Sequence, residues 1–287
     1  MELILVFCIF TMNGTDEVLY NRGHSHFEGQ GSFRFSVSQY LGPALFGSLS
    51  EGALHILERI GWWGHFAMVL VFLNYLYYSK HLHILLAFPN TYFAKLTPKG
   101  QFLNNPTVTK EVKLMMDPNA DPFSAPPAEE GQTPEKFGAS DVTDLSWVQL
   151  LSAYTCTECG RCTSECPANQ TGKKLSPRKI MMDTRDRLEE VGKNLDKNKG
   201  TFVEDGKQLL DDYISREEIW ACTTCNACVE ACPVSIDPLS IIMELRQYLV
   251  MEQSAAPNEL NIAMSNIENN GAPWPYNQMD RLNWKEE

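Results

Sequence analysis

The sequence predicts a mainly α-helical protein with two unlike parts: a transmembrane-helix anchor and, after it, an all-helical domain that holds eight of the nine cysteines. Three observations support this prediction. Residues 60–79 contain no Asp, Glu, Lys or Arg, the eight cysteines are confined to residues 156–166 and 222–232, and no alternating strand pattern follows residue 143. With 287 residues the chain is long enough for one large or two modest domains.

The charge divides the chain in the same way. The formal net charge is −12, yet residues 1–100 hold 6 basic and 6 acidic side chains, whereas residues 101–287 hold 18 basic and 30 acidic ones. A duplex-binding protein needs Lys and Arg to neutralise phosphates, so no nucleic acid partner is expected. The two parts are expected to lie in different solvents, lipid for the first and water for the second.

The run 60–79 is the expected transmembrane helix, since its 20 residues would span roughly 30 Å, the thickness of the hydrocarbon core of a bilayer. Aromatic residues near its two ends are typical of interfacial belts, namely Trp62, Trp63, Tyr75, Tyr77 and Tyr78. A buried helix in the core of a soluble protein is the alternative. Several lysines follow the run, and the positive-inside rule then places the chain after residue 80 in the cytoplasm.

The whole anchor is expected to occupy residues 1–96. Residues 3–12 are apolar but too few to cross a bilayer, and we interpret them as the partial end of an earlier membrane helix. Residues 13–47 are interpreted as an outer loop. Residues 48–59 have apolar side chains at helical spacing and predict an amphipathic helix on the outer interface.

Three further segments follow the anchor. Residues 97–143 lack periodicity and contain clustered prolines, which predicts a proline-rich linker. Residues 144–253 are expected to form the helical domain, and residues 254–287 a tail. The expected helix starts are marked by capping residues, namely Thr143 or Asp144, Ser176 before Pro177, Ser215 with Glu218, and Asp237 before Pro238. Gly192 is expected to end the second of these helices.

The cysteines form one motif twice. C-x2-C-x2-C-x3-C-P occurs at residues 156–167 and again, 66 residues later, at residues 222–233. This is the spacing of bacterial ferredoxins, in which three thiolates hold one [4Fe-4S] cluster and the fourth ligates the other cluster. We therefore expect two [4Fe-4S] clusters with crossed ligands. Cluster 1 is assigned to Cys156, Cys159, Cys162 and Cys232, and cluster 2 to Cys222, Cys225, Cys228 and Cys166.

Other uses of cysteine fit the motif less well. Structural zinc sites take paired C-x2-C knuckles without a third evenly spaced cysteine or a trailing proline. Disulfides need an oxidising compartment, which the predicted topology excludes. Cysteines that merely fill a core would not repeat a five-residue pattern. A purely structural iron-sulfur or zinc scaffold, without a redox role, stays as an alternative.

The doubled motif with a helical insertion resembles the all-helical two-cluster ferredoxin domain of the iron-sulfur subunits of succinate dehydrogenase, heterodisulfide reductase and anaerobic glycerol-3-phosphate dehydrogenase. The preceding segments Trp62-Trp63-x-His65, Tyr78-Ser79-Lys80-His81-Leu82-His83 and Phe88-Pro89-Asn90 resemble the last membrane helix of an anchor similar to the nitrate reductase gamma subunit. Together they imply a membrane-bound iron-sulfur oxidoreductase of the heterodisulfide-reductase-like group. The implied location is the bacterial inner membrane, with the clusters on the cytoplasmic side.

Two features depart from that resemblance. Such proteins usually begin with several more membrane helices, whereas this sequence contains one complete predicted span. They also continue into cysteine-rich CCG modules, often after a segment like G-N-P-W-G, and this chain offers Gly271-Ala272-Pro273-Trp274 and stops at Glu287. We therefore expect the chain to be truncated at both ends, with any CCG chemistry outside it.

Three histidines are candidate haem ligands. The gamma subunit holds b-type haem between histidines of paired helices, so the resemblance implies that His65, with His81 or His83, supplies half of each haem site. His65 and His83 are 18 residues apart and would share one face of an unbroken helix, roughly 27 Å apart along its axis. The alternative is that all three are ordinary polar groups at a membrane boundary.

Two functions follow from these observations. The first is electron transfer between a cytoplasmic redox partner protein and a membrane acceptor, either haem or quinone. The second is a catalytic oxidoreductase, acting on a disulfide, a hydroxy acid or glycerol phosphate through CCG modules. The acidic pairs are expected to be solvated helix faces, with a docking surface for a basic partner as the alternative; they are Glu189-Glu190, Asp211-Asp212 and Glu217-Glu218. No oligomeric state is predicted.

Overall fold

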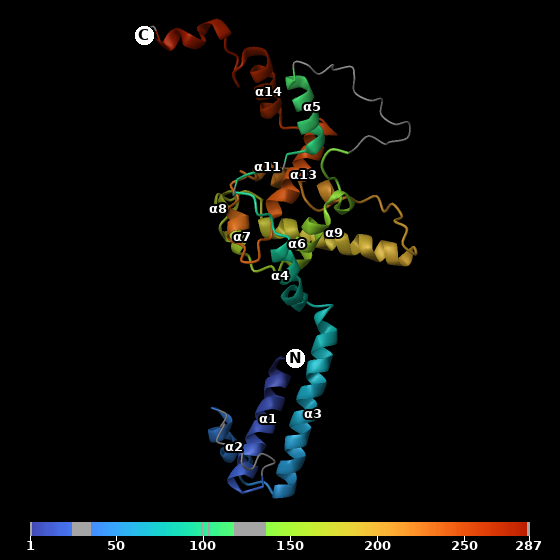
Figure 1. Cartoon of the computed structure of the whole chain (residues 1–287), viewed down its shortest axis with the longest axis vertical. Coiled ribbons are helices and arrows are strands. Elements are labelled where there is room, and N and C mark those ends of the chain that lie inside the picture. The colour runs from blue at the N-terminus through green and yellow to red at the C-terminus, as the bar shows by residue number, and fades with distance from the viewer. Residues whose placement is uncertain (1, 25–35, 99, 103, 118–135, 286–287) are drawn as a thin grey trace. The chain divides into compact units, whose positions relative to one another are not determined.

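The computed structural model describes residues 2–24, 36–98, 100–102, 104–117 and 136–285. These residues form α-helices and short 3-10 helices, and within them the only β-structure is an isolated bridge between Leu210 and Ile214. The fold class is therefore mainly α, as predicted. The chain forms two compact units, Met1–Leu82 and His83–Glu287 (Figure 1).

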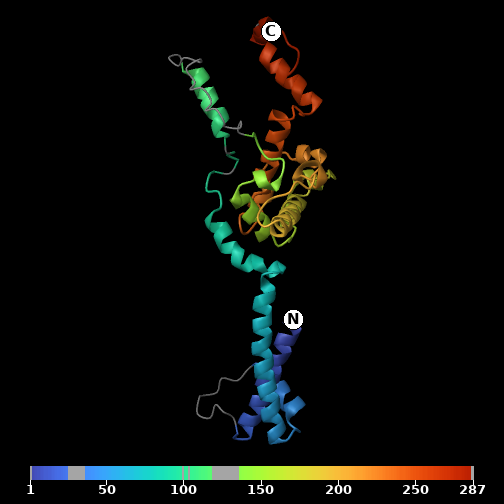
Figure 2. The same ribbon diagram turned by 90° about the vertical axis from the view of Figure 1, so that its right-hand side faces the viewer.

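The first unit contains α1 (Glu2–Asn21), α2 (Ser38–Phe46), α3 (Glu51–Leu76) and the 3-10 helix η1 (Lys80–Leu82). Helices α1 and α3 lie side by side in both views (Figures 1 and 2). Their close approach depends on Gly61, because a Cβ atom there would lie 2.8 Å from the backbone nitrogen of Met12.

Both long helices of this unit are apolar and long enough to cross a membrane. Within the unit α3 buries only Leu54, Glu58 and Gly61. Most of its other large apolar side chains are exposed, among them Ile60, Trp63, Phe66, Leu70, Val71, Leu73 and Tyr75. A helix in the core of a soluble protein would bury most of such side chains.

The predicted partial helix 3–12 is wrong, because α1 continues to Asn21. Its polar residues do not interrupt the helix. The hydroxyls of Thr11 and Thr15 donate to carbonyl oxygens four residues earlier, at 2.8 and 2.7 Å, so these side chains are satisfied within the helix itself. The part of the chain that the structure describes thus contains two candidate membrane spans, where the sequence predicted one complete span.

The other boundaries of the anchor also differ from the prediction. The expected outer loop 13–47 is helical at both ends, where α1 and α2 lie, and its residues 25–35 lie outside the described part. The expected interfacial helix 48–59 and transmembrane helix 60–79 form the single helix α3. No proline interrupts this stretch, and the helix continues through Arg59 and Gly61.

The second unit begins with α4 (His83–Tyr92), which the sequence placed in the anchor. This helix packs on α6 (Trp147–Thr155). Beyond its end, the ring of Phe93 meets the edge of Trp147 with centroids 4.7 Å apart. The boundary between the units therefore lies after residue 82, before the predicted end of the anchor at residue 96.

The expected linker 97–143 is not uniformly irregular. Helix α5 (Pro106–Met116) lies within it, and the clustered prolines fall in residues 118–135, outside the described part. Its last residues already pack on the helical domain. Gly138 has φ +73°, and a Cβ there would lie 2.3 Å from the carbonyl oxygen of Glu244, so only glycine fits. Ala139 is fully buried beside it, and the domain therefore begins before residue 144.

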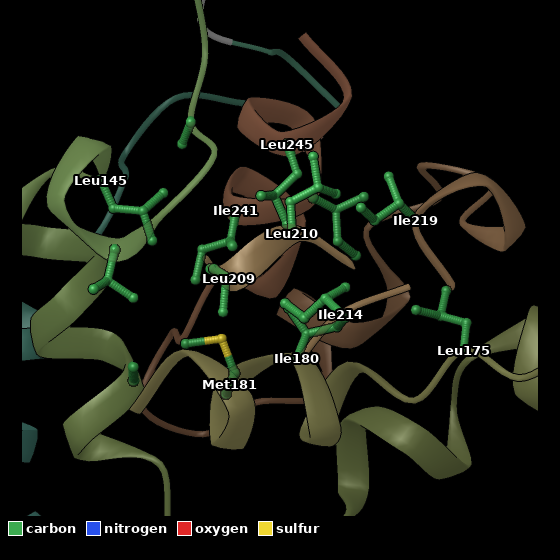
Figure 3. Close-up of a cluster of buried hydrophobic side chains, with 14 of the residues drawn as sticks. Leu145, Leu175, Ile180, Met181, Leu209, Leu210, Ile214, Ile219, Ile241 and Leu245 are labelled. Carbon is green, nitrogen blue, oxygen red and sulfur yellow. The ribbon is translucent and has the colours of Figure 1, made fainter. Parts of the chain in front are cut away.

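The core of the second unit lies between α6, α9 (Pro177–Lys197), α11 (Arg216–Ala221) and α13 (Pro238–Met251). Figure 3 shows aliphatic side chains from these helices and their connections facing one another, including Ile180, Ile219, Ile241 and Leu245. Each buried aliphatic side chain contributes roughly 1.5–3 kcal/mol to the stability of the folded unit.

The remaining elements of the second unit within the described residues are η2 (Val142–Asp144), α7 (Arg161–Ser164), α8 (Pro167–Gln170), α10 (Leu209–Asp212), α12 (Ala227–Glu230), α14 (Asn258–Asn270) and η3 (Gln278–Lys285).

Candidate metal centre

Each cysteine motif begins where a helix ends. Helix α6 ends before Cys156 and helix α11 ends before Cys222. Both cysteines adopt the same extended conformation, with φ −64° and ψ 122° for Cys156 and φ −69° and ψ 126° for Cys222. The chain therefore leaves the two helices in the same way.

The loops that follow match residue for residue. Glu158 and Thr224 have φ angles of 61° and 56°, and Gly160 and Asn226 have φ angles of 82° and 61°. Each pair is separated by the 66-residue period of the motif. Left-handed residues in such loops turn successive backbone N–H groups toward one centre, a geometry that is common around anions and iron-sulfur clusters. Three of the four are not glycine, and such strain is typical of functional sites.

Two cavities lie between the motifs, and each is lined by three cysteines of one motif and the fourth cysteine of the other. The first is lined by Cys156, Cys159, Cys162 and Cys232, and also by Cys228. The second is lined by Cys166, Cys222, Cys225 and Cys228. Within the described residues no three Cys, His, Asp or Glu side chains meet around a single ion. The lining of the two cavities therefore brings the eight cysteines together in two groups, with Cys228 common to both.

The electrostatics of the thiols agrees with this grouping. Burial raises the pKa of the thiols of Cys156, Cys162 and Cys222, and it raises that of Cys228 to about 12. The fourth cysteine of each set makes a smaller contribution in the same direction: Cys232 raises the pKa of Cys156, and Cys166 raises that of Cys222. Iron binds the thiolate, so cluster assembly must release these protons. Four soft sulfur ligands around each cavity fit a [4Fe-4S] cluster.

Backbone amides point at two of the sulfurs. The N–H of Thr224 donates to the Sγ of Cys222, and the N–H of Ile236 donates to the Sγ of Cys232, both at 3.4 Å. Such bonds stabilise the extra negative charge of a reduced cluster and so raise its potential.

An arginine lies near the first cysteine of each motif. Arg246 on α13 donates to the carbonyl oxygens of Ile219 and Cys222, at 2.7 and 2.5 Å, and stacks on Trp220 with its guanidinium carbon 5.0 Å from the ring centroid. Among the described residues no carboxylate forms an ion pair with it. The sequence did not mark this arginine as a site residue, since it is 24 residues from Cys222 on a different helix.

The arginine near the other motif is neutralised. Arg185 on α9 lowers the pKa of Cys156, against the larger effect of burial. It pairs with the carboxylate of Glu158 at 2.8 Å and lies 3.6 Å from that of Asp186. Arg185 is therefore paired with carboxylates and, within the described residues, Arg246 is not, while Arg161 and Arg178 also line the first cavity.

The structure separates the three candidate haem histidines. His65 lies in α3, His81 in η1 and His83 at the start of α4. Because α3 ends at Leu76 and η1 intervenes, no unbroken helix joins His65 to His83, and the predicted shared face is wrong. His83 also belongs to the second unit.

The family model of the 4Fe-4S dicluster domain matches residues 155–236, which include all eight cysteines of the two motifs. Among curated proteins, a probable iron-sulfur-binding oxidoreductase, FadF of Bacillus subtilis, is 32% identical over 260 residues, covering 81% of this chain and 34% of the relative. The EtfAB:quinone oxidoreductase of Syntrophomonas wolfei is 30% identical over 262 residues, covering 85% of this chain and 33% of the relative.

A probable membrane-anchored ferredoxin of Chromohalobacter salexigens is 31% identical over 164 residues, covering 52% of this chain and 24% of the relative. Subunits C and D of CoB-CoM heterodisulfide reductases from Methanosarcina species also match. No solved structure matches the chain. The chain spans about a third of the length of FadF and of the quinone oxidoreductase. It thus contains a 4Fe-4S dicluster domain and is related to iron-sulfur oxidoreductases and heterodisulfide reductase subunits, which confirms the resemblance predicted from the sequence.

Proposed function

We propose that this chain is the electron-transfer part of a membrane-anchored iron-sulfur oxidoreductase, and that it relays electrons between a soluble redox partner protein and a quinone. The observation that carries the proposal is the pair of cysteine-lined cavities. Cys228 lines both, so the two sites adjoin within one small domain. When bound, each [4Fe-4S] cluster supplies one-electron chemistry, and two adjoining clusters suit a relay.

The residues of the chain have distinct roles in this proposal. Cys156, Cys159, Cys162 and Cys232 hold cluster 1, and Cys222, Cys225, Cys228 and Cys166 hold cluster 2. The crossed fourth cysteine ties the two halves of the domain together, so that neither site forms without the other motif. The amides of Thr224 and Ile236 and the guanidinium of Arg246 adjust the charge around the sulfurs.

Membrane anchoring is supported by the first unit. Helices α1 and α3 are long and apolar enough to span a membrane, and most of the large apolar side chains of α3 are exposed. The membrane-anchored ferredoxin among the relatives supports the same proposal. The lysines after residue 79 favour the cytoplasmic face of a bacterial inner membrane for the second unit.

The partner and the acceptor are proposed from the relatives. One relative is named as an EtfAB:quinone oxidoreductase. By analogy, a protein of the EtfAB type would deliver electrons to this chain and a quinone would receive them. The name of this relative gives a quinone, and haem is left out of the proposed route.

A second candidate function is a catalytic oxidoreductase of which this chain is one part. It is favoured by the length of the relatives, since the chain spans about a third of FadF. Disulfide reduction or oxidation of a hydroxy acid would then depend on CCG modules of a longer protein, and the same two clusters would exchange electrons with those modules.

The relay can be tested in anaerobic membranes that contain the protein. The clusters are first reduced, excess reductant is removed, and a water-soluble quinone analogue is added while cluster absorbance is followed. We expect rapid reoxidation in the wild type and slow reoxidation in Cys225→Ser. Clusters that stay reduced beside the quinone would contradict the proposed acceptor.

A further inference from the structure

The side chain of Asn90 bridges two distant segments of the second unit. It lies in α4 and is only 1% exposed. Its Nδ2 donates to the carbonyl oxygen of Val234, 144 residues away, at 2.7 Å. Its Oδ1 accepts from the hydroxyl of Ser152 on α6 at 2.8 Å. Both ends of the amide are therefore satisfied, and the Val234 carbonyl, which can only accept, requires the NH2 end of the amide to face it.

Val234 lies in a strained loop that starts at a candidate cluster ligand. The next residue, Ser235, has φ +57°, a left-handed conformation that is unfavourable for a residue other than glycine. The residue after it, Ile236, donates its N–H to the Sγ of Cys232. A strained conformation persists only where surrounding contacts hold it, and the bond from Asn90 acts one residue before the strained position.

The other repeat has no such loop. Cys166 is followed directly by helix α8, and Asn169, which stands 66 residues before Ser235, is helical. The side chain of Asn169 donates to the carbonyl oxygen of Leu175 at 3.0 Å, a contact within its own segment. Support from a distant helix is thus specific to the loop after Cys232.

We propose that Asn90 is a positioning residue for cluster 1. It holds the Val234 carbonyl so that Ser235 keeps its left-handed conformation and the Ile236 N–H stays directed at the sulfur of Cys232. The inference rests on the proposed assignment of Cys232 to cluster 1. Helix α4, which carries Asn90, directly follows the first unit in the chain. This helix therefore supports the loop beside cluster 1 and not the loop beside cluster 2.

The test is an EPR-monitored redox titration of the full-length protein carrying Asn90→Leu, which removes both hydrogen bonds without adding charge. Titrations of Cys159→Ser and Cys225→Ser first assign the two signals. We expect the potential of cluster 1 to fall, because a loosened loop weakens the N–H···S bond from Ile236, while the potential of cluster 2 stays at its wild-type value. Asn169→Leu is the matched control and should leave cluster 1 unchanged.

Several outcomes would overturn the inference. A lower melting temperature with an unchanged cluster 1 potential would make Asn90 merely structural, and equal shifts of both clusters would remove its specificity. If Asn90→Leu does not take up clusters, Ser152→Ala decides: it leaves the Nδ2 donor but removes the hydrogen bond that holds the Oδ1 end of the amide, and should lower the potential of cluster 1 by less. An unchanged potential in that variant overturns the inference. A wild type without reducible clusters would instead refute the proposed function.

Discussion

The guanidinium of Arg187 is fully buried and forms a bidentate ion pair with Asp141, 46 residues earlier in the chain, with Nη2 2.7 Å from Oδ2. The same guanidinium pairs with Asp205, with Nη1 2.6 Å from Oδ2, and donates to the carbonyl oxygen of Lys207 at 2.7 Å. One buried cation on α9 therefore joins the segment before α6 to the loop after α9. The pKa of this arginine is raised, chiefly by its hydrogen bonds to the two aspartates.

Replacing Arg187 by Met should destabilise the second unit strongly. The substitution leaves Asp141 and Asp205 without their partner, and breaking a buried ion pair on one side costs about 3–5 kcal/mol. Unfolding of the cluster-loaded protein in denaturant measures the change. The exposed Lys193 on the same helix is the control, and Lys193→Met should change stability by less than about 0.5 kcal/mol. Equal effects of the two variants would show that the buried pairs contribute nothing.

The ion pair of Asp205 should also set a pH dependence. The hydrogen bond from Arg187 lowers the pKa of Asp205 below its ordinary value of 3.8. A carboxyl with a lowered folded-state pKa contributes its stability fully above the unfolded value and loses it as the pH falls through the folded value. The difference in melting temperature between the wild type and Asp205→Asn should therefore be constant from about pH 7 to pH 5 and shrink only below about pH 4. A difference that already shrinks near neutral pH would contradict the lowered pKa.

Removing the charge of Arg246 should lower the potential of cluster 2. The guanidinium faces the Cys222 backbone without a carboxylate partner among the described residues, so it stabilises the more negative reduced state. Asp237 lies near Cys228 and offsets part of this effect. We expect Arg246→Met to shift the potential by on the order of 30–60 mV, up to a tenfold change in a one-electron equilibrium. Arg185→Met should shift cluster 1 less, because Glu158 already neutralises Arg185.

The crossed ligand sets make a specific prediction for the two fourth cysteines. Cys166→Ser should remove or alter the cluster held by the second motif, and Cys232→Ser the cluster held by the first. EPR spectra of the two variants, compared with those of Cys225→Ser and Cys159→Ser, measure which signal changes. If Cys166→Ser instead reproduced the spectrum of Cys159→Ser, each motif would hold its own cluster and the crossed assignment would be wrong.

The exposed apolar surface of α3 should decide membrane retention. Leu70 is 46% exposed and lies in the middle of the uncharged run 60–79, and an arginine near the middle of a membrane span costs about 2.5–3.5 kcal/mol on insertion. Leu70→Arg should therefore release more protein into the soluble fraction after alkaline carbonate washing. Leu96→Arg changes an exposed leucine outside the helices and serves as the control. Equal retention of both variants would argue against insertion of α3.

Local features of the helical domain were predictable because their signals are local. Ser215 and Glu218 form the predicted capping box, with the Glu218 carboxylate accepting from the Ser215 N–H at 2.9 Å. Ser176 caps α9 as predicted, accepting from the N–H of Lys179. The end of α9 was predicted wrongly at Gly192: a glycine can occupy a helix interior, and α9 continues to Lys197.

Features that depend on distant partners were not predictable in this way. Glu218 belongs to an acidic pair expected to be a solvated face, yet it is 6% exposed and pairs with Lys179 at 2.9 Å. Arg187 stands among other charged residues of α9, and nothing in its sequence neighbourhood distinguishes it from an exposed arginine. Its burial depends on its ion pairs with Asp141 and Asp205. Likewise, Asn90 stands in a segment that resembles a membrane anchor, and only the folded chain brings it to Val234.

The most direct test of the two-cluster relay is iron and acid-labile sulfide analysis of the anaerobically purified protein, together with its EPR spectrum after reduction with dithionite. We expect about eight iron and eight sulfide per chain and an EPR signal from reduced [4Fe-4S] clusters. Bound zinc without sulfide, or iron-loaded protein with no signal after reduction, would contradict an electron-transfer role and support a purely structural metal scaffold.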